Sequence, residues 1–325
     1  MSQPVGIGVL GARSMVARLA VLPAIEASSK ATLVAAASLS GPVPGPWAIA
    51  TVPDYQAVID HPDVEAIYIP LPNNMHRAWT VAAAAAGKHV LCEKPLAASA
   101  DDARAMQAAC DSSGTLLAEA WMTPFDSRWR HAMQLAADGV VGDITEINSA
   151  FTFTIGPEGA NNYRWSPDHG GGALLDVGIY CLGPAVELWG SQPAVIESSV
   201  DVAPSGVDAT TTVRLTWPDG QVARARVSFV DAEQQRLEIV GATGRIVLDR
   251  DAHTGGPNAK RIRVESDTTT SPSPGRSIDV EPGDPYLEMI DAFAAAVRET
   301  QRWPRPVERS IEMLELLSQI RTSAQ

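Results

Sequence analysis

The sequence predicts an α/β protein with two domains: an N-terminal domain on a parallel sheet, and a C-terminal α+β domain with an open, mainly antiparallel sheet. In residues 1–121, short apolar segments without strict alternation are separated by helical ones, which is typical of parallel strands covered on both faces. After residue 121 the strand-like segments alternate and carry many β-branched residues, as antiparallel strands do. We therefore place the domain boundary between residues 121 and 122, and the second domain runs to residue 325.

The first domain alternates strands with helices. Ser99 is a predicted helix N-cap, and Gly87 and Gly114 are predicted to end helices. Parallel sheets of this kind bind ligands at the carboxyl ends of their strands. The predicted strands are 5–11, 31–38, 64–72, 88–92 and 115–121, and the predicted helices are 14–25, 55–60, 75–87 and 99–114.

The second domain has strand-like segments on both sides of a long predicted helix, residues 170–190. The Pro-Asp-Gly sequence within 217–221 is typical of a hairpin turn. Residues 253–260 are rich in turn formers, and 267–275 are predicted to be a flexible surface excursion. The predicted strands are 144–155, 210–217, 221–230 and 235–241, and helices are predicted at 285–300 and 306–323.

Composition excludes several classes of protein. The net charge of −13 would repel phosphate backbones, so we expect no nucleic-acid partner. No apolar run approaches the roughly 20 residues that span a bilayer, and the N-terminus enters a strand without a signal peptide, so we expect no membrane association. The cysteines, Cys92, Cys110 and Cys181, fit neither a disulfide framework nor a zinc site. We therefore expect a cytoplasmic protein without a metal.

The stretch KHVLCEKPLA, residues 88–97, places Glu93 and Lys94 where a buried strand ends. The residue before a proline is pushed out of the helical region, so Lys94 is predicted to be extended. A bond from lysine to proline can also be cis, and a cis bond would aim the side chain of Lys94 in one fixed direction. The alternative interpretation is a strand that ends in a polar turn.

A glycine-rich strand-to-helix turn, GIGVLGARSMV, opens the chain and would hold a pyrophosphate on helix amides. Counted from Gly11, the dinucleotide-binding fingerprint lacks its second and third glycines. Counted from Gly6, it fits Gly6, Gly8 and Gly11, but these glycines then lie largely inside the strand. The second strand ends at Ser38 without the acidic residue that binds a ribose. The alternative is a tight turn with no ligand.

Four motifs together carry a family resemblance: GVLGA, VEAIYIPLPNNMH, AGKHVLCEKP and GGGALLDVGIY. In their order and spacing the chain resembles the Gfo/Idh/MocA oxidoreductases, in the branch that holds glucose–fructose oxidoreductase, D-xylose dehydrogenase and dimeric dihydrodiol dehydrogenase. The resemblance implies an N-terminal dinucleotide-binding Rossmann domain and a C-terminal substrate-binding domain whose exposed sheet face often makes a dimer. It also implies that Lys94 and Tyr180 face the nicotinamide, with Asp176 as the acidic neighbour.

The resemblance leaves the choice between NAD and NADP open. Relatives that use NADP often carry an arginine just after the second strand, where this chain has Leu39, and Arg13 would compensate by reaching a 2′-phosphate. The substrate cannot be carried over, because EAWMTPFDSRW departs from the motif of the branch. The predicted cofactor-binding residues are Gly11, Ala12, Arg13, Ser14, Met15, Ser38, Leu71, Pro72, Asn73, His76, Glu93 and Lys94.

Tyr163, Arg164, Trp165 and His169 are the predicted substrate-binding residues, since an arginine beside aromatic rings suits a polar ring substrate. For Arg164 the alternative is an interdomain ion pair, and for His169 a solvated loop histidine. His76 has the alternative role of packing a loop.

The chemistry of the residues agrees with these roles. Asp176 and Tyr180 are four residues apart, so they share one face of the predicted helix. The glycines before that helix, residues 170–172, allow close backbone approach to something flat or anionic. A tyrosine would donate or accept the proton of an alcohol if a nearby ammonium favoured its phenolate.

We therefore expect an NAD(P)-dependent oxidoreductase that transfers hydride between nicotinamide and a sugar, polyol or related cyclic alcohol or carbonyl compound. The expected assembly is a homodimer or a dimer of dimers. The alternatives are a dinucleotide-binding sensor without turnover, and a redox-cycling lyase or hydrolase that retains its cofactor.

Overall fold

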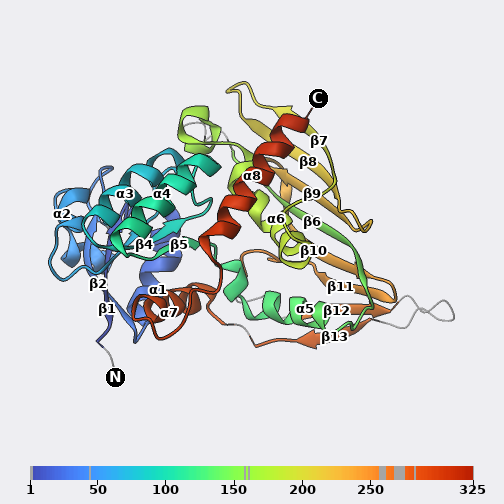
Figure 1. Ribbon diagram of the computed structural model, residues 1–325, viewed down its shortest axis with the longest axis horizontal. Coiled ribbons are helices and arrows are strands. Elements are labelled where there is room, and N and C mark those ends of the chain that lie inside the picture. The colour runs from blue at the N-terminus through green and yellow to red at the C-terminus, as the bar shows by residue number, and fades with distance from the viewer. Residues whose placement is uncertain are drawn as a thin grey trace. The chain divides into compact units, whose positions relative to one another are not determined.

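The computed structural model describes residues 3–43, 45–156, 159, 162–255, 261–266, 275–281 and 283–324. The predicted turn-rich and flexible segments lie largely outside these residues, at 256–260 and 267–274. The chain divides into two compact units, one of residues 1–121 and 286–312, the other of residues 122–285 and 313–325 (Figure 1). Residues 286–312, which the sequence analysis assigns to the second domain, thus belong to the first unit.

The sheet of the first unit is parallel throughout, with the strand order β2-β1-β3-β4-β5. Its central strands are buried on both faces, which explains why their sequences are apolar without alternation. This confirms the predicted parallel sheet. The strands are β1 (Val5–Leu10), β2 (Ala31–Ala37), β3 (Ala66–Ile69), β4 (His89–Glu93) and β5 (Leu117–Ala120).

Helices connect these strands, and α3 and α4 lie side by side over the sheet (Figure 1). The predicted end signals of α4 are confirmed: the Ser99 hydroxyl accepts a hydrogen bond from the amide of Asp102, and Gly114 has a left-handed φ of 66°. The first helix begins with a π-helical turn. The helices are η1 (Ala17–Val21), α1 (Leu22–Ala27), η2 (Gly45–Ala50), α2 (Tyr55–Ile59), η3 (Asn73–Met75), α3 (His76–Ala85) and α4 (Ala100–Ser113).

Residues 286–312 join the first unit because their side chains bind it. Arg298 follows helix α7 (Pro285–Val297), and its Nη2 donates to the Glu65 carboxylate at 2.8 Å. The same carboxylate accepts a bond from the amide of Gly6 in β1. Ser28, which ends α1, donates to Asp291 of α7. These contacts are far apart in sequence, so a linear division at residue 121 does not reveal them.

The second unit is built on an eight-stranded sheet in the order β13-β12-β11-β10-β6-β9-β8-β7. All neighbours in it are antiparallel except β6 and β9, which confirms the mainly antiparallel prediction. The strands are β6 (Ile144–Thr154), β7 (Val195–Val202), β8 (Asp208–Thr216), β9 (Val222–Ser228), β10 (Val230–Gly241), β11 (Gly244–Leu248), β12 (Arg261–Ser266) and β13 (Arg276–Asp279).

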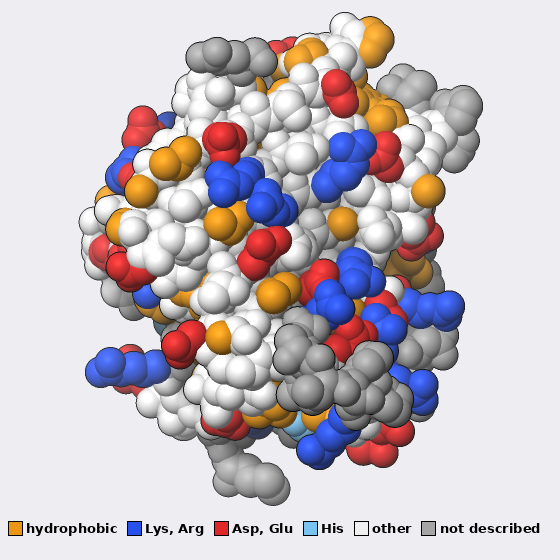
Figure 2. All heavy atoms as spheres, turned by 90° about the vertical axis from the view of Figure 1, so that its right-hand side faces the viewer, with side chains coloured by type: hydrophobic (Ala, Val, Ile, Leu, Met, Phe, Trp, Pro, Cys, Tyr) orange, Lys and Arg blue, Asp and Glu red, His pale blue; other side chains and the backbone are white. Residues whose placement is uncertain are grey.

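One face of this sheet is apolar and packs against α6, the long predicted helix (Ala173–Trp189). Helix α6 is buried over most of its length because its polar residues are few. The other face carries ion pairs such as Arg224–Glu146 and Arg245–Glu265, and Figure 2 shows basic and acidic side chains intermixed on this side of the protein. The remaining helices are η4 (Thr123–Phe125), α5 (Ser127–Ala137), η6 (Tyr163–Trp165), η7 (Pro167–His169) and α8 (Val307–Ser323).

Candidate active site

The predicted cofactor-binding residues lie at one edge of the parallel sheet of the first unit. Gly11 follows β1, Ser38 follows β2, Leu71 follows β3 and Lys94 follows β4. Because these strands are parallel, their carboxyl ends meet at the same edge. The strand order reverses between β1 and β3, and ligands of such sheets bind at this switch point.

Gly11 is required by the backbone at this point. Its φ is +95°, and a Cβ built on it would lie 2.7 Å from Cδ2 of Leu71. Gly6 and Gly8 instead lie inside β1, where a Cβ on Gly8 would lie 2.5 Å from Val58. Gly6 and Gly8 therefore allow close packing around β1 and do not form part of the turn.

The turn after Gly11 suits a pyrophosphate. The amides of Gly11 and Ala12 donate to the carbonyl of Ala37, while the Ser14 hydroxyl accepts from the amide of Ala17 and caps the helix that begins there. The amides of Gly11, Ala12 and Ala17 thus donate to protein groups. That amides of the following helical turn bind a phosphate stays a prediction. The residues at this edge fit a dinucleotide.

Arg13 lies over the loop that follows β2. Its Nη1 donates to the carbonyl of Pro42 at 3.2 Å and would lie 3.4 Å from a Cβ built on Gly41. In the same loop the hydroxyls of Ser38 and Ser40 lie 3.1 Å apart. The guanidinium and the two hydroxyls therefore line one loop, which contains the exposed Leu39.

Glu93 is buried at the end of β4 and is occupied by protein groups. Its Oε1 accepts from the Tyr68 hydroxyl at 2.7 Å, and its Oε2 accepts from the amide of Lys94 at 3.2 Å. Burial raises the pKa of Glu93 to about 7, although the bond from Tyr68 acts in the opposite direction. The peptide bond from Lys94 to Pro95 is cis. That Glu93 also contacts the cofactor stays a prediction.

His76 ties two of the loops together. Its Nε2 lies 2.8 Å from the carbonyl of Leu71, and its Nδ1 lies 3.1 Å from that of Pro95 and 3.2 Å from that of Leu96. The ring is fully buried, and burial lowers its pKa. The structure thus supports the alternative role of packing loops. Asn73, in η3, is also buried.

In the second unit Asp176 and Tyr180 are both buried on α6. Arg164 donates from Nε to Oδ2 of Asp176 at 2.6 Å, and its Cζ lies 5.0 Å from the centre of the Tyr163 ring. Burial lowers the pKa of the Arg164 guanidinium, but the Asp176 carboxylate outweighs this effect and raises it. Arg164 therefore forms an ion pair within the second unit, where the sequence analysis considers one between domains.

The other two predicted substrate-binding residues, Trp165 and His169, contact different parts of the protein. The ring of Trp165 packs edge-on against Phe229, with centroids 5.4 Å apart. His169 is exposed and its Nδ1 lies 2.9 Å from the Ser166 hydroxyl, as the alternative of a solvated loop histidine predicts. The substrate roles of these residues stay predictions.

Two glycines before α6, Gly171 and Gly172, lie close to polar groups of the protein itself. A Cβ on Gly171 would lie 2.4 Å from the carbonyl oxygen of Arg164, and one on Gly172 would lie 2.2 Å from Oδ1 of Asp208. Oδ2 of Asp208 accepts from the amide of Leu174 at 2.6 Å, at the start of the helix. The anionic group that the glycines admit is therefore the Asp208 carboxylate.

His253, which no sequence motif indicates, packs beside Tyr180. Its ring is 6.2 Å from that of Tyr180 and stacks on Phe151 at 5.6 Å. Its Nε2 lies 3.1 Å from the carbonyl of Ala150, and burial lowers its pKa to about 4, so the ring is neutral. A histidine in a turn-rich segment carries no periodic signal, because its neighbours come from distant strands.

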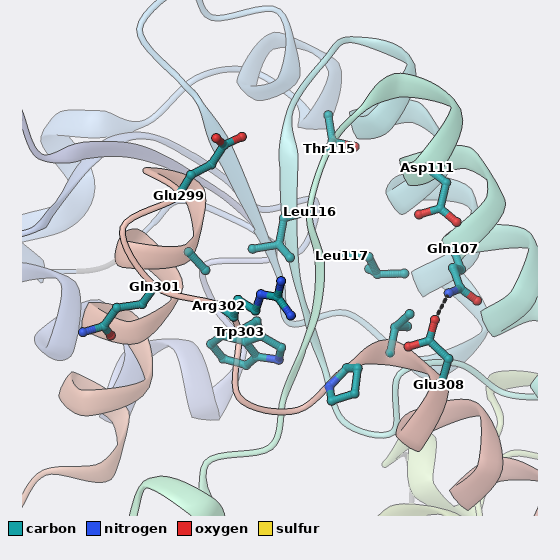
Figure 3. A pocket seen from close by; sticks show the side chains of 13 residues that line it. Gln107, Asp111, Thr115, Leu116, Leu117, Glu299, Gln301, Arg302, Trp303 and Glu308 are labelled. Carbon is teal, nitrogen blue, oxygen red and sulfur yellow. Dashed lines mark hydrogen bonds between the residues drawn. The ribbon is translucent and has the colours of Figure 1, made fainter.

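Lys94 lies in the first unit and Tyr180 in the second. That the two side chains act together stays a prediction. A pocket of about 530 Å³ in the first unit lies elsewhere, beside Leu116 and Leu117 at the start of β5 and over Trp303 (Figure 3). It includes none of the predicted site residues.

Among the described residues, no group of histidine, cysteine and carboxylate side chains is arranged to hold a metal ion. Of the helices that the structure describes, none is both long and apolar enough to cross a membrane.

Comparison with known proteins identifies the fold. Residues 5–120 match the oxidoreductase family with the NAD-binding Rossmann fold, and residues 129–247 match the GFO/IDH/MocA C-terminal domain. The chain belongs to the GFO/IDH/MocA oxidoreductases. This confirms the resemblance, the Rossmann fold of the first domain, the class of enzyme and the nicotinamide dinucleotide as cofactor.

Relatives in the family cover nearly the whole chain. D-xylose 1-dehydrogenase (NADP(+)) 2 of Haloferax volcanii is 32% identical over 98% of this chain and 97% of its own. The dTDP-3,4-didehydro-2,6-dideoxy-alpha-D-glucose 3-reductase of Streptomyces antibioticus is 35% identical over 90% of this chain and 88% of its own. The structure of KijD10, a 3-ketoreductase from Actinomadura kijaniata in complex with NADP and TDP-benzene, has a TM-score of 0.87 at 28% identity, over 99% of this chain and 98% of its own.

Replacing Glu93 with glutamine should change how stability depends on pH. Because the folded-state pKa of about 7 lies above the ordinary 4.5, the contribution of Glu93 to stability is full below pH 4.5 and is lost as pH rises through 7. At 1.36 kcal/mol per unit, the loss is about 3 kcal/mol. The free energy of unfolding, measured with urea from pH 4.5 to 8, should fall with pH in the parent protein but not in Glu93→Gln. At pH 8 the variant should therefore have gained about 3 kcal/mol relative to the parent.

Glu26 on α1 is exposed, so Glu26→Gln is the control and should keep the parent's pH dependence. An unchanged pH dependence in Glu93→Gln would show that Glu93 ionises normally in the folded protein.

Proposed function

We propose that this enzyme transfers hydride between NADP and a carbinol or carbonyl carbon of a sugar or sugar derivative, with Tyr180 as proton donor or acceptor and Lys94 as its activator. The observation that carries the proposal is that Lys94 follows β4 at the same edge of the parallel sheet where Gly11 follows β1 and Leu71 follows β3. Two relatives, a D-xylose dehydrogenase and a dTDP-sugar reductase, support a sugar or sugar derivative as the substrate.

The residues of the first unit would hold the cofactor. The turn Gly11–Met15 would bind the pyrophosphate on helix amides, and Leu71, Pro72 and Asn73 would line the opposite side of the switch point. When bound, the nicotinamide supplies a carbon that accepts or releases hydride.

Tyr180 would move the substrate's proton. In alcohol oxidation its phenolate oxygen would take the hydroxyl proton, and in ketone reduction its hydroxyl would return it. An ammonium group close to a phenol favours the phenolate. Lys94 would therefore lower the pKa of the Tyr180 hydroxyl toward neutral pH.

Asp176 and Arg164 would orient the substrate. Nε of Arg164 donates to Oδ2 of Asp176 at 2.6 Å. The terminal nitrogens would donate to substrate hydroxyl or phosphate oxygens, because a guanidinium held at one side presents its other donors in a fixed plane.

Lys94→Met should abolish turnover and leave the fold intact, since the side chain keeps nearly its length but loses its charge. We expect kcat to fall by about 100-fold or more, within the range of lost general acid–base catalysis, in an assay of nicotinamide absorbance over a panel of sugars and sugar nucleotides. Lys30→Met is the control, because Lys30 is half-exposed and its nearest carboxylate oxygen is 3.9 Å away.

Full activity of Lys94→Met would remove Lys94 from the mechanism. The same panel distinguishes the alternatives: a sensor would bind cofactor without hydride exchange, and a redox-cycling lyase or hydrolase would consume substrate without net change in absorbance.

Arg13 would select NADP by binding its 2′-phosphate together with the hydroxyls of Ser38 and Ser40. Its guanidinium already lies over this loop, and a charge-assisted hydrogen bond contributes about 1.5–3 kcal/mol. Arg13→Gln should therefore weaken NADPH binding about 10–100-fold and leave NADH binding nearly unchanged, measured by cofactor fluorescence.

Arg18→Gln, which removes an exposed arginine from the helix that follows the turn, should leave both affinities unchanged. An equal loss for NADPH and NADH in Arg13→Gln would show that Arg13 does not read the 2′-phosphate.

We also propose that the protein is a cytoplasmic homodimer, or a dimer of dimers, joined through the outer face of the eight-stranded sheet. The three cysteines are buried thiols, as suits a reducing compartment. The outer face intermixes arginine and carboxylate side chains (Figure 2), so a two-fold axis would bring opposite charges together.

The double variant Arg224→Glu/Arg226→Glu should dissociate the dimer, because it places like charges in the contact. Light scattering after gel filtration would measure the mass. Arg104→Glu, on α4 of the first unit, is the control and should remain dimeric. A parent protein that is monomeric at micromolar concentration would contradict the proposal.

A further inference from the structure

The loop that carries Lys94 is held through its backbone by a buried carboxylate. The amide of Leu96, two residues after Lys94, donates to Oε1 of Glu119 at 2.8 Å. The carbonyl oxygen of Leu96 in turn accepts from Sγ of Cys92 and lies 3.2 Å from Nδ1 of His76. Both the amide and the carbonyl oxygen of Leu96 are therefore hydrogen-bonded. Of the three partners, Glu119 is the acidic one.

Glu119 itself is held by residues from the far end of the sequence. Its Oε2 accepts from Nη1 of Arg305 at 2.6 Å and from the hydroxyl of Ser310 at 2.7 Å. The side chains of Arg305 and Glu119 are only 9% and 3% exposed. The guanidinium also lies over the ring of Trp121, with Cζ 5.0 Å from the ring centre.

Both bonds to Oε2 come from the segment that leaves α7 and enters α8. Nη1 of Arg305 donates to Ser310 as well, at 2.6 Å, and Nη2 donates to the carbonyl of Arg309 at 3.0 Å. The guanidinium is thus fixed by its own segment before it reaches Glu119. Rigid donors of this kind fix the orientation of a carboxylate.

We propose that Arg305 and Ser310 are positioning residues for Lys94, acting through Glu119 and the amide of Leu96. This inference rests on the proposed function, in which Lys94 activates Tyr180. A displacement of about 1 Å at a catalytic group lowers a rate by about 100-fold, so a shift of this turn would change the rate of the chemical step more than the affinity for cofactor.

A purely structural role is the competing interpretation, and the chain offers a matched control. Arg298 lies in the same segment and also pairs with a carboxylate, that of Glu65. Glu65 bonds to the amide of Gly6 at the start of β1, which is the opposite end of the sheet from Lys94. Loss of Arg298 would loosen the segment without touching the Lys94 loop.

The experiment compares Arg305→Met, Arg305→Lys, Ser310→Ala and Arg298→Met in the full-length protein, with NADPH affinity, KM, kcat and melting temperature measured for each. We expect Arg305→Met to lower kcat about 10–100-fold while NADPH affinity and KM stay within about threefold of the parent's. Arg305→Lys should recover part of kcat, and Ser310→Ala should lower it in the same direction. Arg298→Met should lower the melting temperature and keep kcat.

The double variant Lys94→Met/Arg305→Met tests whether Arg305 acts through Lys94. If it does, the double variant has the same residual kcat as Lys94→Met alone, because two substitutions that disable the same catalytic group do not have additive effects. If Arg305→Met fails to fold, Ser310→Ala answers the question, since it removes a hydrogen bond without leaving an unpaired buried charge.

The inference is overturned if folded Arg305→Met and Ser310→Ala keep the parent's kcat, or if Arg298→Met lowers kcat as much as Arg305→Met. Failure of the proposed function has a different signature: Lys94→Met would then keep its activity, whatever the variants at Arg305 show.

Discussion

A carboxylate that is removed from water must be paired or hydrogen-bonded, and the candidate active site depends on this constraint. Glu93, Glu119, Asp176 and Asp208 are all nearly inaccessible to solvent. Each fixes a different part of the site: Glu93 binds Tyr68 and the amide of Lys94, Glu119 the amide of Leu96, Asp176 the guanidinium of Arg164, and Asp208 the start of α6. The carboxylates thus act mainly on the backbone and on other side chains.

The same constraint helps to hold residues 286–312 in the first unit. Arg305 brings a guanidinium to the buried Glu119, while Arg298 pairs with Glu65, whose side chain is 40% exposed. In a buried setting the arginine is needed because its planar donors satisfy both the carboxylate and neighbouring groups. The C-terminal segment is therefore part of the structure that presents Lys94, although it is separated from Lys94 by about two thirds of the sequence.

Glycine has two roles in this fold that sequence patterns do not separate. Gly11 has a positive φ beside Leu71, in the turn after β1 where the fingerprint predicts a glycine. Gly172 also has a positive φ, but the group close to it is the carboxylate of Asp208. A glycine shows that something approaches the backbone, and only the surrounding structure shows whether that is a ligand or another part of the protein.

The sequence by itself determined the fold class, the helix ends at Ser99 and Gly114, and the family, because these depend on local periodicity, capping and short motifs. It also placed Gly11, Ser38, Leu71 and Lys94 at strand ends, which parallel pairing then brings to one edge. The tertiary structure alone decided that Asp176 pairs with Arg164, that His253 packs beside Tyr180, and that Arg305 reaches Glu119. These contacts join residues that share no period and no neighbouring sequence, so their partners are set by how the elements pack and not by local pattern.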